Sequence, residues 1–436
     1  MRAHSQVPQQ ASKVGLVSLV AVAAVLLTSS NLRSSVSSFP PIAGDVTSGL
    51  NASTMFIGLV GMAPTAMFAL AAAMSGPLAR MLSFRAVTTT AMVLAAAGFG
   101  ARAVAPNEPI FLAGTMVGLV GVGITNTLLP AVVKNYFPFR LTVMSMAYLV
   151  AGQFSMATAS VVAVPLANWA GWRVAIGVWA IPPVLAVICW GVLVYLVTPG
   201  APAERGKHML HRSRPKALYR AVRSTRGGNR PPEQGSGGGG GGVAAKNIWR
   251  HPVAWGIVAM FAMTSSISYC FITWAPKIIV ESGGSPEFGG VIGGVFATVG
   301  IVSAIVVPWA VGRFAKGAAA VTVCSCACMY VALAMVLYDP MFHPVGWISL
   351  VSLGCSTFPL GMLLVATRTR EAKAAARLSS GAQTVGYTVA CLGPFGFGAL
   401  FDATGSWDTG LTVLLGVNTA LLVAGLIASR NVYVDD

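Results

Sequence analysis

The sequence predicts an all-α integral membrane protein with twelve transmembrane helices in two pseudo-symmetric six-helix bundles. Three observations favour this fold class: an apolar composition, twelve long apolar segments, and a repeat that relates the two halves of the chain. Of the 436 residues, 55 % are hydrophobic and 9 % are charged. A soluble domain has about 25 % charged residues. This chain has too few polar residues to cover a soluble core, so we expect it to lie in a bilayer.

Twelve segments are long and apolar enough to cross a membrane, for which a helix needs about 20 residues. The first begins at Val14 and is interpreted as an uncleaved span, because no A-x-A cleavage pattern follows it. The predicted limits are 14–42, 55–74, 86–104, 110–133, 141–166 and 174–197 in the first half, and 253–280, 288–311, 317–337, 345–366, 378–400 and 409–429 in the second.

The distribution of Lys and Arg predicts the orientation of these spans. If both termini are cytoplasmic, 24 of the 28 basic residues fall in cytoplasmic segments, and Arg102, Arg173 and Lys277 fall in outside loops. Cytoplasmic loops are enriched in Lys and Arg, and an odd number of spans would destroy this asymmetry. We therefore expect a bacterial inner-membrane protein with cytoplasmic N- and C-termini. The remaining basic residue is Arg33.

The chain divides into two apolar halves around a basic, glycine-rich segment. A glycine run at 237–242 is typical of a flexible tether, and the basic residues before it are expected to lie on the anionic cytoplasmic leaflet. A regulatory role for this segment is the alternative. The predicted organisation is a cytoplasmic N-terminus at 1–13, a first bundle at 14–197, a linker at 198–251, a second bundle at 252–429 and a cytoplasmic tail at 430–436.

The two halves repeat each other in sequence. Pro130 precedes Gln153 by 23 residues, and Pro359 precedes Gln383 by 24 residues. Parallel repeats related by an axis along the membrane normal place a substrate site between the halves at mid-depth. The repeat therefore predicts a site at the interface of the two bundles.

Several other classes of function are excluded by the residues present. The net charge of +16 comes from basic residues between apolar runs, so we expect no nucleic-acid partner. The CSCAC run at 324–328 has no His or carboxylate nearby, and alternate helical residues point roughly 200° apart, so we expect no metal. All five histidines lie outside the spans, so we expect neither an enzyme active site nor a cofactor site within them.

The acidic residues are all predicted to lie in loops, in the linker or in the tail. Carboxylates inside spans commonly carry protons or sodium ions in transporters. The predicted spans therefore lack the usual intramembrane ion carrier, and a cationic substrate would find no counter-charge at the centre.

Arg33 is the single charged residue predicted away from the ends of a span. An arginine near the middle of a helix costs about 2.5–3.5 kcal/mol on insertion scales, and no acid in the spans offsets this. Ser29, Ser30 and Ser37 share its face and leave room beside the guanidinium. Its planar donors suit carboxylate-like anions, which favours an anion site. The alternative is that Arg33 extends to the membrane surface or caps carbonyls of a broken helix.

Other polar residues inside the predicted spans are candidates for the same site. Each has an alternative interpretation as a hydrogen-bonding contact between helices. Tyr269 occupies the position that mirrors Arg33 when Pro40 is matched to Pro276. The candidate substrate-binding residues are Arg33, Asn126, Gln153, Tyr269, Gln383 and Tyr387.

The motifs of both halves resemble those of one family of membrane transporters. They are SNLRSSV (30–36), NTLLPAVVK (126–134), AGWR (170–173), SYCFITWAP (268–276), FPLGMLLVATRTR (358–370), LSSGAQTVGY (378–387) and DATGSW (402–407). They are similar to the cyanate and nitroimidazole transporter family of the major facilitator superfamily. The sequence departs from the family pattern at Ser34, where the family has proline.

This resemblance implies the major facilitator fold, with Arg33 as the substrate-facing cation and with Gln383 and Tyr387 in the cavity. Together with the charge pattern, it predicts alternating-access transport of a small cyanate-like or carboxylate-like anion by a monomer. Two alternatives remain: efflux of a flat aromatic compound such as a nitroimidazole, and a membrane sensor that signals through its linker without transporting.

Overall fold

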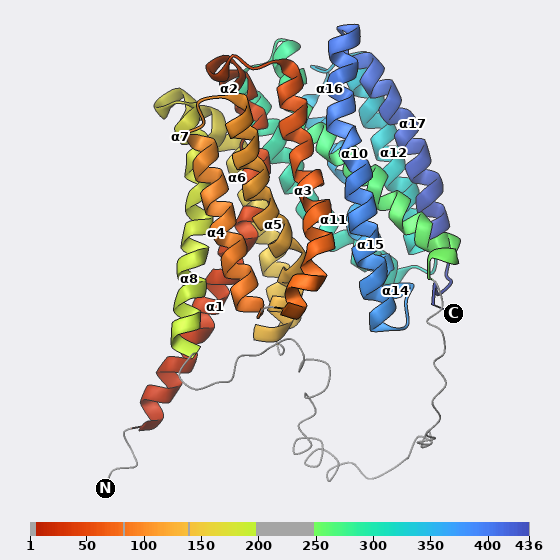
Figure 1. The fold of residues 1–436 in the computed structure, drawn as a ribbon. Helices are drawn as coiled ribbons and strands as arrows, with labels where there is room; N and C mark the ends of the chain where they lie inside the picture. The colour runs from red at the N-terminus through yellow and green to blue at the C-terminus, as the bar shows by residue number, and fades with distance from the viewer. Residues whose placement is uncertain (1–5, 82, 138–139, 198–247, 436) are drawn as a thin grey trace.

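The computed structural model describes residues 6–81, 83–137, 140–197 and 248–435. These residues form helices joined by short connections, and twelve segments are long and apolar enough to cross a membrane. The predicted all-α fold with twelve spans is therefore confirmed. Figure 1 shows the first half, coloured red to yellow, beside the second half, coloured green to blue.

The six spans of the first half are built from ten helical elements. They are α1 (Gln6–Ser37), η1 (Pro40–Ile42), α2 (Ala43–Leu50), α3 (Thr54–Met81), α4 (Phe84–Ala103), α5 (Glu108–Tyr136), α6 (Leu141–Ala170), α7 with η2 (Trp172–Gly177 and Val178–Ala180), and α8 (Ile181–Val197).

The second half follows the same plan of six spans. Its elements are η3 (Ile248–Arg250), α10 (Pro252–Glu281), α11 (Pro286–Arg313), α12 (Gly317–Tyr338), α13 (Pro344–Gly354), α14 (Thr357–Thr367), α15 (Ala372–Ala390), α16 (Leu392–Thr404) and α17 (Trp407–Ala428). The tenth span is divided between α13 and α14, and the eleventh between α15 and α16.

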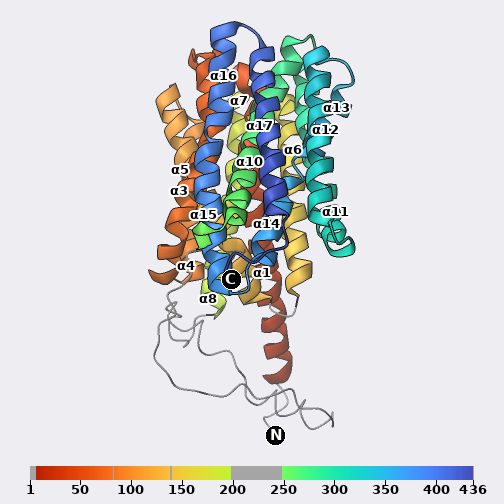
Figure 2. The ribbon, with the colours of Figure 1, turned by 90° about the vertical axis from the view of Figure 1, so that its right-hand side faces the viewer.

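The two halves share one direction through the membrane. In Figure 1, α1 begins, α8 ends, α10 begins and the last described residues lie at the lower end of the molecule. We call this the linker end and the other the far end. In Figure 2, turned by 90°, the long helices of both halves run along the same axis. This agrees with an even number of spans in each half.

Capping side chains begin three of the helices at the far end. Asn107 accepts a hydrogen bond from the backbone N–H of Ile110 before α5, and Ser285 accepts one from Phe288 before α11. Ser406 accepts one from the N–H of Asp408 before α17. Such caps satisfy backbone donors that have no partner within the helix, so these short connections turn directly into the next span.

The first span continues further than expected. It was predicted to end at residue 42, but after the short η1 the chain forms α2 up to Leu50. Pro40 and Pro41 interrupt the α-helix because proline has no backbone N–H to donate. In the second half, Pro276 lies inside α10 without ending it. The two prolines that the sequence repeat matches therefore differ in structural effect.

The sequence predicted that every acidic residue lies in a loop, in the linker or in the tail, and this prediction is wrong for some of them. Six occupy the first or last three residues of a described helix, because the helices continue past their apolar stretches. They are Asp45, Glu108, Glu281, Glu287, Asp402 and Asp408. The central turns of the described spans carry no carboxylate.

Candidate functional site

Arg33 lies on α1 at the interface between the halves. Its side chain is half-buried, and Gly152 of α6 lies beside its aliphatic stem. A Cβ added at Gly152 would come within 3.9 Å of the Arg33 Cγ. Within the described part of the chain, the Arg33 guanidinium makes no ion pair and no hydrogen bond. Its charge is therefore open to a partner from outside the chain.

Two tyrosines from the second half face this charge. Tyr269 of α10 and Tyr387 of α15 are buried, and both interact electrostatically with Arg33 and with each other. The side chain of Asn126, on α5, lies within hydrogen-bonding reach of the Tyr387 hydroxyl. The structure thus brings together four of the six candidate residues, two from each half.

Aromatic rings surround the Tyr387 side chain. Its ring meets Phe68 of α3 edge-to-face at 5.6 Å between centroids, and Phe261 of α10 at 5.0 Å. Phe261 also contacts Phe358 of α14 at 5.0 Å. The hydroxyl of Tyr387 is therefore held at the interface by a rigid apolar wall formed by both halves.

The serines around Arg33 bind neighbouring backbone groups instead of leaving a polar opening. Ser29 donates to the carbonyl of Tyr148, and Ser37 donates to the carbonyl of Met156 at 3.1 Å, so both hold α1 against α6. Ser30 donates to Leu26 on its own helix. Gly152 lets α6 approach α1 closely here, since a Cβ at this position would lie 3.3 Å from the Ser29 Oγ.

The two glutamine candidates lie outside the central group. Gln153 Nε2 donates to the carbonyl of Ala297 on α11 at 3.1 Å, so this side chain joins the halves. Gln383 Nε2 donates to Ser379 Oγ on its own helix, one turn toward the linker end from Tyr387. In this state, Gln153 is a contact between helices and Gln383 flanks the site.

The far-end cations were expected in loops, and that expectation is wrong. Arg102 lies in the last turn of α4, Arg173 in α7 and Lys277 in the last part of α10. Each is held over aromatic rings, for example Arg173 at 4.2 Å from the Trp172 centroid. The predicted limits 86–104 and 253–280 already included Arg102 and Lys277, and this was the sequence signal that both residues are helical.

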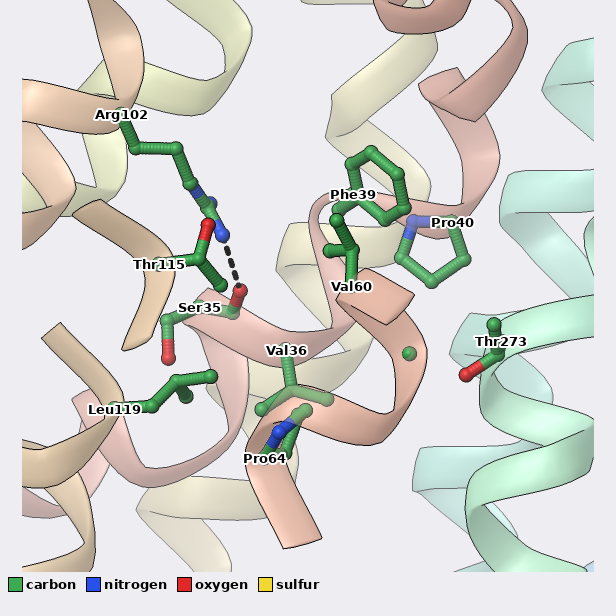
Figure 3. A pocket seen from close by; sticks show the side chains of 11 residues that line it. Ser35, Val36, Phe39, Pro40, Val60, Pro64, Arg102, Thr115, Leu119 and Thr273 are labelled. Atoms are coloured by element: carbon green, nitrogen blue, oxygen red, sulfur yellow. Dashed lines mark hydrogen bonds between the residues drawn. The ribbon is translucent and has the colours of Figure 1, made fainter. Parts of the chain in front are cut away.

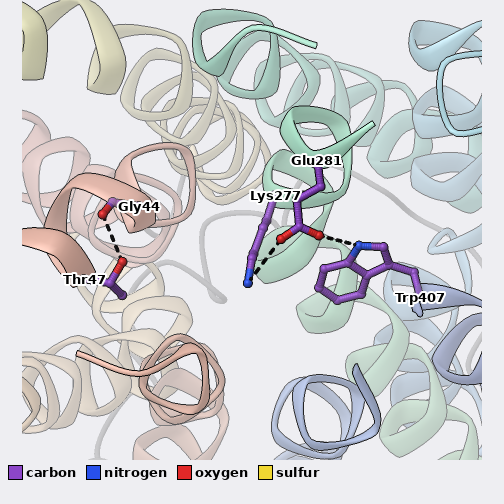
Figure 4. Close-up of polar contacts among 5 residues, drawn as sticks. All are labelled: Gly44, Thr47, Lys277, Glu281 and Trp407. Atoms are coloured by element: carbon purple, nitrogen blue, oxygen red, sulfur yellow. Dashed lines mark hydrogen bonds and ion pairs between the residues drawn. The ribbon is translucent and has the colours of Figure 1, made fainter. Parts of the chain in front are cut away.

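Lys277 shows how these cations are held. Figure 4 shows its ammonium group paired with Glu281, whose second carboxylate oxygen accepts a hydrogen bond from Trp407. The ion pair is 3.5 Å long and joins residues one helical turn apart. Lys277 thus has a counter-charge, which Arg33 lacks among the described residues.

The central group has the chemistry of an anion site. Arg33 supplies a positive charge with planar donors, and the hydroxyls of Tyr269 and Tyr387 can donate hydrogen bonds. Burial strengthens such interactions because the effective dielectric constant falls to about 4–20. A cation would meet only repulsion from Arg33.

Twelve spans in two bundles around a polar centre define the architecture of a secondary transporter. The family model of the Major Facilitator Superfamily matches residues 19–394. The chain belongs to this superfamily, and it is a multi-pass transporter of small molecules and not an enzyme.

Comparison with known proteins confirms the resemblance seen in the motifs. The chain is 27 % identical over 417 residues to the 2-nitroimidazole transporter of Escherichia coli (strain K12), covering 95 % of this chain and 96 % of that protein. It is 22 % identical over 334 residues to the cyanate transport protein CynX of the same organism, covering 75 % of each. The solved structure of the nucleoside transporter NupG matches with a TM-score of 0.67 at 13 % identity, covering 94 % of this chain and 98 % of that one, and supports the fold alone.

Proposed function

We propose that this transporter carries a small anion, cyanate-like or carboxylate-like, by alternating access around Arg33. The observation that supports this most strongly is the half-buried guanidinium at the interface, which has no ion pair within the described residues. Asn126, Tyr269 and Tyr387 complete the proposed binding site. Gln153 and Gln383 are proposed to reach the substrate in other states of the cycle.

The shape of the guanidinium favours a planar anion. Arginine offers parallel N–H donors that bind two oxygens, or two ends of a small planar ion, at once. Tyrosine hydroxyls from the second half would bind the opposite side of the substrate. A bound anion would then link the two bundles, as a mechanism in which they rock about a central site requires.

Replacement of Arg33 by lysine tests this proposal. Arg33→Lys keeps the charge and loses the planar donors, so we expect uptake of labelled substrate anion by proteoliposomes to fall at least tenfold, which corresponds to about 1.4 kcal/mol. Arg173→Lys, at the far end, is the matched control and should retain uptake. Insertion and melting temperature should be near normal in both variants. Unchanged uptake by Arg33→Lys would show that Arg33 does not bind the substrate.

Efflux of a flat aromatic compound is the second candidate function. The rings of Phe68, Phe261 and Phe358 adjoin Tyr387, and a planar heterocycle could stack on such a wall. A relative is named as a 2-nitroimidazole transporter. Competition between labelled cyanate and 2-nitroimidazole, measured in the same proteoliposomes, distinguishes the two substrate classes.

The remaining alternative from the sequence, a sensor that signals through its linker without transporting, is not proposed, because the chain belongs to a superfamily of transporters. Residues 198–247, which contain most of the predicted linker, lie outside the described residues. Deletion of residues 205–242 should leave flux unchanged in a transporter and abolish output in a sensor. The linker is proposed to lie on the anionic leaflet through its basic residues.

The cellular setting follows from the charge asymmetry. We propose a monomer in a bacterial inner membrane, with the linker end in the cytoplasm. The described helices have connections with few charges at the far end and several arginines at the linker end, as cytoplasmic segments usually have. Protease accessibility in right-side-out and inverted vesicles tests this orientation.

A further inference from the structure

A second arginine is buried at the far end, away from the central group. Arg102 of α4 is 1 % exposed and lines a small cavity together with residues of α1, α3, α5 and α10. Figure 3 shows its guanidinium directed toward α1, where it donates to the carbonyl of Ser35. Arg33 lies beside Gly152 of α6 instead. The side chains of Arg33 and Arg102 therefore lie on different sides of α1.

The charge of Arg102 is not compensated by the described residues around it. Its Nη1 donates to Ser35 O at 3.3 Å and its Nη2 to Ser38 Oγ at 3.4 Å, and both bonds are longer than the usual 2.7–3.2 Å. Its Nε has no partner in the described part of the chain. The rings of Phe99 and Phe111 lie 5.4 and 5.6 Å from its Cζ. All these partners are neutral.

A buried guanidinium of this kind calls for a counter-ion. Burying a charge without an opposite charge costs several kcal/mol. Weak hydrogen bonds and ring faces recover only part of this, since a cation–π contact contributes about 0.5–2 kcal/mol. A small anion beside Arg102 would restore both the charge balance and the missing hydrogen bond.

The dimensions of the cavity limit the anion to a very small one. Its interior has space for about one particle the size of water. Thr115 also lines the cavity, but its hydroxyl donates to the carbonyl of Phe111 on its own helix at 2.8 Å, so Arg102 is the donor for the anion. Among anions, a monatomic halide comes nearest to this size, whereas gluconate and other organic anions are too large.

The cavity wall includes a residue from the second half. Thr273 of α10 closes the side opposite α4 and lies against Gly61 of α3, with its Cγ2 in the space that a Cβ at Gly61 would need. The cavity is therefore complete only when the two halves meet at the far end. An anion bound there would stabilise that closed arrangement.

We propose that the Arg102 cavity is a binding site for a small inorganic anion of chloride size, separate from the central Arg33 site. The site assembles when the halves close at the far end, and its anion neutralises Arg102. This inference does not depend on what the transporter carries, because it involves neither Arg33 nor the two central tyrosines.

Thermal unfolding of the purified protein in detergent tests the site. Chloride is titrated against gluconate at constant sodium concentration. The wild type and Arg33→Gln should both show a saturable rise in melting temperature, about 2 °C or more at tenfold the dissociation constant. Arg102→Gln should lose this rise. Removal of the proposed central site should therefore leave the chloride effect intact. The chloride-site proposal and the proposed transport function can thus be disproved independently of each other.

A second variant protects the test against misfolding of Arg102→Gln. Val36 lines the same cavity and is partly exposed, so Val36→Phe fills the space while keeping Arg102. It should also abolish the chloride effect. The proposal is overturned if the wild type shows no saturable rise, if Val36→Phe or Arg102→Gln retains it, or if Arg33→Gln loses it.

Discussion

Tyr387 is the residue at which the polar and apolar parts of the centre meet. Its hydroxyl is near Asn126 and within the field of Arg33, and its ring packs against Phe68 and Phe261. A tyrosine buried in this way usually keeps a partner for its hydroxyl. Replacement by phenylalanine therefore removes the hydroxyl while it keeps the ring, so the contribution of the hydroxyl can be measured alone.

We expect Tyr387→Phe to weaken substrate binding while the protein stays folded. The substitution keeps the aromatic contacts and removes one hydrogen-bond donor, which contributes about 0.5–1.5 kcal/mol. The KM for anion uptake in proteoliposomes should rise about three- to tenfold with little change in melting temperature. Tyr330→Phe, which alters a partly exposed tyrosine of α12 whose hydroxyl is hydrogen-bonded to Thr419, is the matched control. An unchanged KM would place the substrate away from Tyr387.

At the scale of elements, α6 and α11 cross closely because their contact residues are small. Gly293 of α11 faces Ser160 of α6, and a Cβ at Gly293 would lie 2.1 Å from the Ser160 Oγ. Ser160 also donates to the carbonyl of Gly290 at 2.9 Å. Nearer the far end, Asn168 donates to the carboxylate of Glu287 at 3.1 Å. These contacts hold the halves together along the far-end part of α6 and α11.

Gly293→Ala should separate the halves at the far end. Overpacking of a tight contact costs about 1–3 kcal/mol, so the closed arrangement should be populated several-fold less. Closure is measured as the rate of disulfide formation between the introduced cysteines of Asn168→Cys and Glu287→Cys. A protease site placed in residues 237–242 is cleaved afterwards, so that only a disulfide keeps the two halves of the chain together on a gel. We expect the rate of disulfide formation to fall several-fold.

Two further variants control this experiment. Gly312→Ala, on the same helix, has nothing within 4 Å of the added Cβ and should leave cross-linking unchanged. Ser160→Gly combined with Gly293→Ala removes the clashing hydroxyl and should restore closure. Equal cross-linking in all variants would mean that this contact does not control the far end.

The C-terminal tail is a second element-scale feature, at the linker end. The carboxylate of Asp435 accepts hydrogen bonds from the backbone N–H groups of Arg370 and Glu371, and the N–H of Val434 donates to the carbonyl of Arg368. The tail thus caps the connection between α14 and α15. Burial alone would raise the pKa of Asp435, but hydrogen bonds from Glu371 and then Arg370 outweigh it and lower this pKa below its ordinary value.

Asp435→Ala should loosen this connection at neutral pH. Hydrogen–deuterium exchange should show several-fold lower protection factors for the amides of Arg370 and Glu371, while Asp402→Ala, at the far end, leaves them unchanged. Because the pKa is lowered on folding, this stabilisation is complete above the ordinary value of about 3.9 and is lost as the pH falls through the lowered value. Loss of protection already at pH 6 would contradict this assignment.

At the scale of the whole molecule, the central charge affects which form of the carrier reorients. With Arg33 as the cation of the core, the empty site is positive and the site loaded with a monovalent anion is nearly neutral. Moving an unpaired arginine through a dry interface costs more than moving a well-paired one. The loaded carrier should therefore reorient more easily than the empty carrier.

Exchange should accordingly be faster than net transport. Proteoliposomes preloaded with unlabelled substrate should take up label several-fold faster than empty ones at matched membrane potential. The Arg173→Lys variant should keep the same ratio, since that residue lies outside the central group. Equal rates with and without preloading would point to an additional co-transported ion.

The membrane spans and the position of Arg33 within the first of them could be predicted from the sequence alone. Twelve apolar runs matched the thickness of a bilayer because insertion depends on the composition of each segment. Arg33 was recognisable because a charge within an apolar run is costly wherever the helix packs. The helix limits were less accurate, as α2 shows, since helices continue beyond the residues that the lipid selects.

The tertiary structure decided which polar side chains meet. Ser29 and Ser37 bind α6, Gln153 binds α11, and Arg102 turns inward against α1 where a loop position was expected. These contacts join residues 67 to 144 positions apart in the chain, so they depend on how helices cross and on where glycine permits close approach. Composition determines that a segment enters the membrane, whereas packing between segments determines what each polar group finds there.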